Sequence, residues 1–424
     1  MSERMEAILA AVDEGFARQV AFLEALVRHP SQRNAEAELQ DFVQSELERR
    51  GFAVDRFRTQ GPADNAHPAF SPATVPYDES WNLVATRKGA GHGRSLALNA
   101  HVDVVPPGPL ARWTTPPYEP RRNGDWLYGR GAGDMKAGLA AAVFALDAIT
   151  QAGLALSGPV QVQSVVDEEM TGNGAATVLS RGYRADAIVI AEPTDGRLVR
   201  ANSGVLKFAV TLQGVPTHPR EPEAGRSAID LAIALIAHLR RLEASWVAEK
   251  ENHALFAGIA NPVSLTVGTI QGGEWLASFP SECRFEGRIG FYPGEEPKAR
   301  MRAFEAFVLS AVADDPMFEG VSPPMVEWVG VTHAGYSLAP GSDAEACLAR
   351  AHMQASGRAL ESYVMTAYLD AAVFAVHAGM PALVYGPVAE NIHAIDERVS
   401  LSSLKAVTKT IALFAADWCG VERA

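Results

Sequence analysis

The sequence has few cysteines, a shortage of basic residues and no long apolar run, and each shortage excludes a class of protein. Only three of its 424 residues are cysteine, and Cys283, Cys347 and Cys419 lie far apart. This predicts neither a disulfide framework nor a cysteine-based zinc site, and reduced thiols in the cytoplasm are the simplest interpretation. The 37 Lys and Arg residues against 50 Asp and Glu give a net charge of −13, which disfavours nucleic acid or an anionic membrane as the main partner.

The sequence shows neither the features of a signal peptide nor those of a membrane-spanning segment. Residues 1–16 carry acids throughout and lack the basic region and apolar core of a signal peptide. No apolar stretch is long enough and free enough of charge to span a bilayer. We therefore expect a cytoplasmic protein with no membrane partner.

The length and the order of predicted elements indicate two domains. A chain of 424 residues exceeds one ordinary core. Residues 3–50 show helical periodicity, interrupted at 29–31, and an Ala-rich helix is predicted over 134–150, with Asp134 in its first turn. Apolar strands are predicted over 82–87, 95–105, 160–166, 187–192 and 381–385, and further helices over 342–356 and 402–418. The fold class is therefore α/β.

Between these elements the pattern changes to a self-contained βαββαβ unit. Its strands are predicted over 207–214, 262–272, 283–291 and 325–332, and its helices over 227–246 and 297–313. We predict a first domain formed by residues 1–200 and 334–424, with the ferredoxin-like unit of residues 201–333 inserted into it.

Three consecutive acids end the apolar strand that begins at Val160. Asp167, Glu168 and Glu169 precede a Gly-Asn-Gly turn, and no Lys or Arg lies nearby before Arg181. Unpaired carboxylates at the end of a buried strand are costly to desolvate, which favours a metal ion as their partner. A solvated acidic turn is the alternative.

Further metal ligands occur at other strand and helix ends: His101, Asp134, Glu192 and His393. The carboxyl ends of strands in an α/β sheet meet in one crevice, where ligands bind. Imidazole and carboxylate together suit Zn²⁺ and, less selectively, Mn²⁺ or Co²⁺. Together with Glu169 the donors exceed what one zinc needs, so we expect two. Taken singly, His101 could be a core histidine, Asp134 a helix cap and Glu192 a surface acid.

Five motifs in order make the sequence resemble a known zinc-dependent family. They are HVD (101–103), GAGDMKAG (131–138), DEEMTGNG (167–174), AEPT (191–194) and IHAIDE (392–397). The family includes acetylornithine deacetylase, succinyl-diaminopimelate desuccinylase, aminoacylase and glutamate carboxypeptidase. The resemblance spans essentially the whole chain and implies a mixed-sheet catalytic domain with an inserted lid that forms a homodimer.

The resemblance also implies roles for the residues at the site. His101 and Glu192 would hold one zinc, Glu169 and His393 the other, and Asp134 would bridge them. Asp103 would orient the His101 ring. Glu168 would be the general base that takes a proton from the attacking water and returns it to the leaving amine.

Two residues of the inserted unit match family positions near the substrate. His218 would reach the neighbouring subunit's site and stabilise the oxyanion, although a loop histidine often has no such role. Arg288 would bind a substrate carboxylate, with a surface ion pair as its alternative. The sequence departs from the family at 277–280 (ASFP) and 367–370 (AYLD), segments that lie near the substrate, so the resemblance leaves the substrate open.

We interpret the sequence as a metal-dependent amidohydrolase that cleaves the amide of an N-acylated amino acid or a related small amine. A carboxypeptidase that releases a C-terminal residue such as glutamate is one alternative, and a deformylase of a non-amino-acid amine is another. A binding or regulatory protein that kept the fold but lost the chemistry is disfavoured by the intact ligand set and by Glu168.

Overall fold

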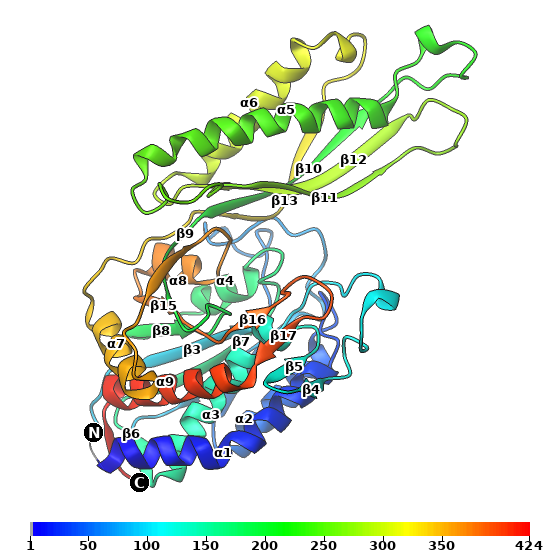
Figure 1. The fold of residues 1–424 in the computed structure, drawn as a ribbon. Helices are drawn as coiled ribbons and strands as arrows, with labels where there is room; N and C mark the ends of the chain where they lie inside the picture. Colours follow the sequence, from blue (N-terminus) through cyan, green and yellow to red (C-terminus); the bar gives the residue numbers. More distant parts are fainter. Residues whose placement is uncertain (1–2) are drawn as a thin grey trace.

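A six-stranded mixed sheet forms the centre of the larger part of the molecule, in a computed structural model that describes residues 3–424 (Figure 1). Its strands follow the order β1-β2-β7-β3-β8-β15. The first two pairings are antiparallel, and β7, β3, β8 and β15 run parallel. The strands are β1 (Ala53–Arg58), β2 (Trp81–Arg87), β3 (Leu96–His101), β7 (Val160–Val165), β8 (Ala187–Ile190) and β15 (Ala382–Val384).

Helices cover both faces of this sheet. On one side α1 (Glu3–Arg28), α3 (Ala137–Gln151) and α9 (Leu401–Cys419) pack against one another, with α7 (Asp343–Ser356) beside α9. Helix α2 (Ala37–Arg49) lies on this same side, where Phe42 stacks on Phe22 of α1, and it contacts β1 and β2. On the other side α4 (Asn173–Ser180) packs against α8 (Ala371–Ala378). One hydrophobic core links these helices to the sheet.

The βαββαβ unit predicted from the sequence is present with that element order. It comprises β10 (Gly204–Gln213), α5 (Ala228–Ala248), β11 (Leu265–Gly272), β12 (Glu282–Phe291), α6 (Pro297–Ala313) and β13 (Met325–His333). The four strands form an antiparallel sheet in the order β11-β12-β10-β13. Both helices lie on the face directed away from the larger part, over a second hydrophobic core (Figure 1).

Shorter sheets complete the described chain. A four-stranded sheet contains β4 (Arg121–Asn123), β5 (Trp126–Tyr128), β16 (Ala389–Glu390) and β17 (Arg398–Ser400), while β9 (Leu198–Asn202) pairs with β14 (Ser362–Met365) and β6 (Leu154–Leu156) with β18 (Val421–Arg423). The α/β class is confirmed. The exact domain boundaries, 1–200 with 334–424 and 201–333, stay a prediction, and residues 1 and 2 lie outside the described residues. Within residues 3–424 no helix is long and apolar enough to cross a membrane.

Two elements have other bounds than the sequence predicted. The strand predicted over 95–105 stops at His101, after which the chain leaves the sheet and Val104 forms an isolated bridge with Gln32. Helix α3 begins at Ala137, so Asp134 is not in its first turn but in the preceding segment, with a non-helical φ of −115° and ψ of 99°. The carboxylate of Glu397 is the reason, since it accepts the N–H groups of Gly133 and Asp134.

Candidate metal centre

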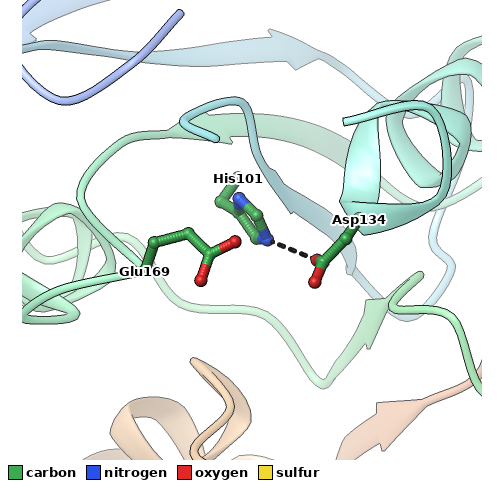
Figure 2. A group of neighbouring side chains, drawn as sticks. All are labelled: His101, Asp134 and Glu169. Carbon is green, nitrogen blue, oxygen red and sulfur yellow. Dashed lines mark hydrogen bonds and ion pairs between the residues drawn. The ribbon is translucent and has the colours of Figure 1, made fainter. Parts of the chain in front are cut away.

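The five predicted metal ligands come from five separate segments. His101 is the last residue of β3, and Asp134 precedes α3. Glu169 lies in the turn after β7, Glu192 lies two residues beyond β8, and His393 lies in the loop from β16 to β17. Figure 2 shows the side chains of His101, Asp134 and Glu169 directed toward one another. The segments thus converge where the parallel strands end.

Asp134 lies between the two histidines. Its Oδ1 is 3.1 Å from Nε2 of His101, and its Oδ2 is 3.3 Å from Nε2 of His393. Glu192 Oε1 lies 3.7 Å from the same His101 nitrogen, and Glu169 Oε1 lies 2.9 Å from the His393 nitrogen. The arrangement therefore consists of two histidine–carboxylate pairs with one shared carboxylate.

The clustered donor atoms are arranged as ligands of metal ions. Donor atoms of His101, Asp134 and Glu169 lie within 4.8 Å of each other. In the described part of the chain, Asp134, Glu169 and Glu192 make ion pairs with histidines only, and the ammonium of Lys207 donates to the main-chain carbonyl of Glu169, not to its carboxylate. Clustered carboxylates without a Lys or Arg ion pair are stabilised by a bound cation, and nitrogen with oxygen donors suits zinc.

The protonation states reflect the same crowding of acids. Burial raises the pKa of Glu192 well above its usual range, and Asp134 adds to the rise while His101 opposes it. Burial lowers the pKa of His393, but hydrogen bonds to Asp134 and Glu169 outweigh this and raise it to about 10. In the absence of metal, protons on the histidines thus provide the positive charge that the carboxylates require.

Asp103 connects His101 to the acidic turn. Its carboxylate accepts the backbone N–H of Glu168 at 3.3 Å and that of Glu169 at 3.1 Å. The same carboxylate lies 3.5 Å from Nδ1 of His101, while the main-chain oxygen of Asp103 lies closer to that nitrogen, at 3.0 Å. Asp103 therefore contacts the ring that it was predicted to orient, and it also fixes the turn that carries Glu168 and Glu169.

Glu168 is buried beside the ligand cluster without being part of it. Its side chain makes no ion pair within residues 3–424, and burial raises its pKa well above the usual range, with Glu192, Asp370 and Glu169 adding to the rise against the effect of His101. A carboxylate with a raised pKa next to a metal-ligand cluster is suited to accept and return a proton.

The assumption that the acidic run has no basic partner was wrong for Asp167. Arg33 Nε lies 2.7 Å from its Oδ1, and Tyr77 donates a hydrogen bond of 2.5 Å to its Oδ2. Arg33 is 134 residues away in the chain, so inspection of neighbouring residues could not find it. Asp167 is a structural ion-pair partner, and the metal argument applies to Glu169 only.

Glu397 is a site residue that sequence reasoning passed over. It is fully buried, pairs with Arg130 at 2.6 Å, and accepts backbone N–H groups of Gly131, Gly133 and Asp134 at 2.9–3.0 Å. It thereby holds the segment that presents Asp134. Its place in the IHAIDE motif was the one available indication, since its partners lie more than 260 residues away.

Residues 367–370, one of the two segments that depart from the family, contribute a buried acid with an aromatic neighbour. Tyr368 donates a hydrogen bond of 2.9 Å to Oδ1 of Asp370, and its ring stacks on His333 at 5.5 Å between centroids. Burial raises the pKa of Asp370 to about 7. Three histidines assigned to no motif, His67, His333 and His377, therefore meet near this segment.

The two lid residues lie in different surroundings. His218 is exposed in the loop after β10, where its Nδ1 accepts the backbone N–H of Arg220. It makes no ion pair with the cluster among the residues that the structure describes. Arg288 on β12 donates to Oγ of Ser264 at 3.2 Å and to the carbonyl of Thr366 at 3.0 Å. Within residues 3–424 Arg288 makes no ion pair, so the alternative of a surface ion pair does not hold.

Comparisons with known proteins agree with the motifs. The model of Peptidase family M20/M25/M40 matches residues 97–417. The N-formyl-4-amino-5-aminomethyl-2-methylpyrimidine deformylase of Halalkalibacterium halodurans is 28% identical over 445 aligned residues, which cover 99% of each chain. Acetylornithine deacetylase of Myxococcus xanthus is 31% identical over 384 aligned residues, 90% of this chain and 92% of its own.

Comparison with solved structures supports the fold. The di-peptidase Dug1p from Saccharomyces cerevisiae superposes with a TM-score of 0.82 at 15% identity, covering 99% of both chains. At this identity the likeness concerns the fold alone, which agrees with the mixed sheet and the inserted βαββαβ unit. The ordered motifs, the convergent ligands and the family match over residues 97–417 lead to one conclusion: this chain belongs to Peptidase family M20/M25/M40.

Proposed function

We propose that this chain hydrolyses the amide bond of a small N-acylated amine or amino acid at a centre with two metal ions. The observation that carries the proposal is the position of Asp134 between two histidine–carboxylate pairs, with Glu168 buried beside them. Family membership supports an amide hydrolase, and the relatives named deacetylase and deformylase both remove an acyl group from an amine.

Each side chain of the centre has a proposed task. His101 and Glu192 hold one ion, Glu169 and His393 hold the other, and Asp134 is shared. Zn²⁺ fits these donors, and Co²⁺ and Mn²⁺ suit the same set. When bound, such ions polarise the scissile carbonyl and make water a stronger nucleophile near neutral pH.

Glu168 is the proposed general base. Its carboxylate takes a proton from the attacking water and delivers it to the leaving nitrogen, so the base is restored at the end of each turnover. Asp103 supports both steps because it holds the backbone N–H groups of Glu168 and Glu169. The acid turn therefore presents one metal ligand and one base from adjacent residues.

The candidate activities differ in the acyl group and the amine of their substrates. A deacylase of acyl-amino acids agrees with the deacetylase relative, and a deformylase agrees with the relative that matches over 99% of the chain. A carboxypeptidase remains the further alternative within the family. A substrate panel decides among them: acetyl, succinyl and formyl amines, and dipeptides, assayed with added Zn²⁺ or Co²⁺.

Variants of the adjacent acids test the mechanism on whichever substrate is cleaved. We expect Glu168→Gln to lower kcat by a factor of about 100 or more with metal content unchanged, as for the loss of a general base. Glu169→Ala should instead lose metal. The proposal fails if Glu168→Gln loses the metal and Glu169→Ala retains both metal and rate.

We further propose a homodimer formed by the lid unit. His218 lies in a loop that packs on the β11–β12 loop, where Phe279 N–H donates to the carbonyl of Thr217 at 3.1 Å. That second loop exposes 67% of Trp275 and 92% of Leu276, and β11 is an edge strand of its sheet. A second copy of the chain would cover these groups and bring His218 to the partner's site.

Mixed dimers test this arrangement. His218→Ala and Glu168→Gln are each expected to be nearly inactive, but refolding equal amounts together should recover roughly a quarter of the wild-type sites, because half the dimers are mixed and each has one intact site. Refolding them separately and mixing in the cold should recover little. Verified mixed dimers without activity would show that His218 acts within its own subunit or has no role.

The cytoplasm is the proposed location. All three cysteines are free and buried, which agrees with reduced thiols in a reducing compartment.

A further inference from the structure

A cavity that the proposed function does not use lies between α1, α2, α3 and the end of β2. Its volume is about 780 Å³. Its three helices lie at the end of the molecule that is far from the lid unit (Figure 1). A smaller cavity of about 330 Å³ adjoins it, because Arg50, Arg87 and Thr150 line both. We name the larger space the arginine cavity after four of its lining residues, Arg18, Arg49, Arg50 and Arg87.

The arginine cavity is separate from the metal centre. Arg87 is the last residue of β2 and pairs in register with Val160, the first residue of β7. The acidic turn with Glu168 and Glu169 follows the other end of β7. A strand rises about 3.3 Å per residue, so the length of β7 places about 17 Å between Val160 and this turn. A ligand in the arginine cavity would therefore bind away from the reacting groups.

Three phenylalanines line the arginine cavity and pack on one another. The ring of Phe22 stacks on that of Phe42 with 5.7 Å between centroids and lies at the same distance from the ring of Phe144. The small side chains of Ala21 and Ala25 on α1 line the same space and leave room beside these rings. Aromatic rings pair favourably at centroid distances of about 4.5–7 Å. The lining thus suits a flat aromatic group.

The charges of the lining favour an anion. The four arginines are accompanied by two acids, Glu46 and Asp147. Both acids pair with Arg50, Glu46 at 2.6 Å and Asp147 at 2.9 Å, and Glu46 also pairs with Arg49 at 2.8 Å. The lining therefore carries two more positive than negative charges, although the chain as a whole has a net charge of −13.

Arg87 is held in place but makes no ion pair within residues 3–424. Its guanidinium lies over the ring of Phe52, 4.1 Å from the centroid, and donates to the carbonyl of Arg50 at 2.9 Å. A longer hydrogen bond of 3.4 Å joins it to the hydroxyl of Thr150. Burial lowers the pKa of Arg87, and the field of Asp147 opposes this only in part. Three of the five N–H donors of Arg87 are left for a ligand.

We propose that the arginine cavity binds a small aromatic carboxylate, a function separate from amide hydrolysis. The ring would pack against the phenylalanines, and the carboxylate would accept hydrogen bonds from Arg87. Arg18 adds positive charge at the same end of α3, where it donates to Gln151 at 2.7 Å. A carboxylate matches the planar guanidinium fork, whereas a phosphate dianion would be repelled more strongly by the two acids of the lining.

Calorimetric titration of the metal-loaded protein with 2-naphthoate and with neutral 2-naphthamide tests the charge requirement. We expect one 2-naphthoate per chain, bound about tenfold or more tightly than 2-naphthamide. Arg87→Met should weaken 2-naphthoate about tenfold and change 2-naphthamide less than about threefold. Because Arg18 is exposed, Arg18→Met should fold normally, and it should weaken 2-naphthoate about two- to fivefold.

Arg94→Met is the matched control. Arg94 also lies over an aromatic ring, 3.5 Å from the centroid of Trp418, but lines neither cavity. It should bind both probes as the wild type does. Equal weakening of both probes by Arg87→Met, or 2-naphthoate affinities unchanged in both Arg87→Met and Arg18→Met, would overturn the proposal. So would a wild-type chain that binds neither probe or both equally.

A variant that fills the cavity tests where the probe binds. Ala21 is exposed on α1 and lines the cavity, so Ala21→Trp should occupy the space without disturbing the core. We expect its thermal unfolding to match wild type and its binding of 2-naphthoate to be lost. If Ala21→Trp binds 2-naphthoate as tightly as wild type, the probe binds elsewhere and the proposal is wrong. These measurements do not involve turnover, so a failure of the proposed amide hydrolysis leaves them unchanged.

Discussion

Replacement of Glu397 by Gln should weaken both the fold and the metal centre. Glu397 has no exposed surface, its Oε2 contacts Arg130 at 2.6 Å and the N–H of Gly131 at 3.0 Å, and its Oε1 accepts two further backbone N–H groups. An amide of the same size can keep the Oε1 contacts. Its NH₂ group would then face two donors, and Arg130 would remain buried without a counter-charge.

The magnitude follows from that geometry. Removal of one partner of a buried ion pair costs about 3–5 kcal/mol, a large part of a typical folding free energy of about 5–15 kcal/mol. Because Glu397 also accepts the N–H of Asp134, the carboxylate proposed to be shared by the two ions should shift, and loss of such a supporting contact lowers metal affinity about 10- to 100-fold. We therefore expect Glu397→Gln to unfold at lower denaturant concentration and to release metal more readily.

Denaturant unfolding and competition with a chelator measure the two effects on the same samples. Glu390→Gln is the control, because Glu390 pairs with Arg398 on the neighbouring strand but keeps 45% of its side chain exposed, so its loss should cost less than about 1 kcal/mol. The reasoning would be refuted if Glu397→Gln matched the control in unfolding midpoint and the wild type in metal affinity.

Two further predictions concern stability. Burial lowers the pKa of His333 to about 3, so this histidine is neutral when folded and protonates near pH 6.5 when unfolded; stability is lost as pH falls below 6.5, by about 2 kcal/mol at pH 5. Between pH 7 and pH 5, the free energy of unfolding of His333→Gln should fall by about 2 kcal/mol less than that of wild type. If both proteins lose the same free energy over this range, His333 is not the neutral buried histidine described here. Gly172 has φ of +71°, and a Cβ there would lie 2.0 Å from the hydroxyl of Tyr368. Gly172→Ala should cost about 1–3 kcal/mol more than Gly51→Ala, where φ is +80° but nothing lies within 4 Å; equal losses would mean that Tyr368 moves freely.

Local sequence patterns predicted the elements whose residues are apolar and periodic. The βαββαβ order, the helices at both ends of the chain and most central strands could be read in this way. Strand β1 was not predicted, because Asp55, Arg56 and Arg58 interrupt its apolar pattern at the edge of the sheet.

Sequence predicted those parts of the site that depend on residues close together in the chain. His101 ends a buried strand, and Glu169 and Glu192 follow two others, so their convergence could be anticipated. The backbone of Asp134 could not, since Glu397 sets it from 263 residues away. The same holds for Arg33 beside Asp167 and for Lys207 beside Glu169, because tertiary contacts alone bring these basic groups to the acidic turn.

The most direct test of the account is the rate of amide hydrolysis by a metal-stripped sample as Zn²⁺ is added. Two histidine–carboxylate pairs that share Asp134 predict no hydrolysis in the stripped enzyme and a rate that rises with bound zinc to saturation at two ions per chain. Bound metal should be measured in the same samples. Full hydrolytic activity in the stripped enzyme would contradict the central claim.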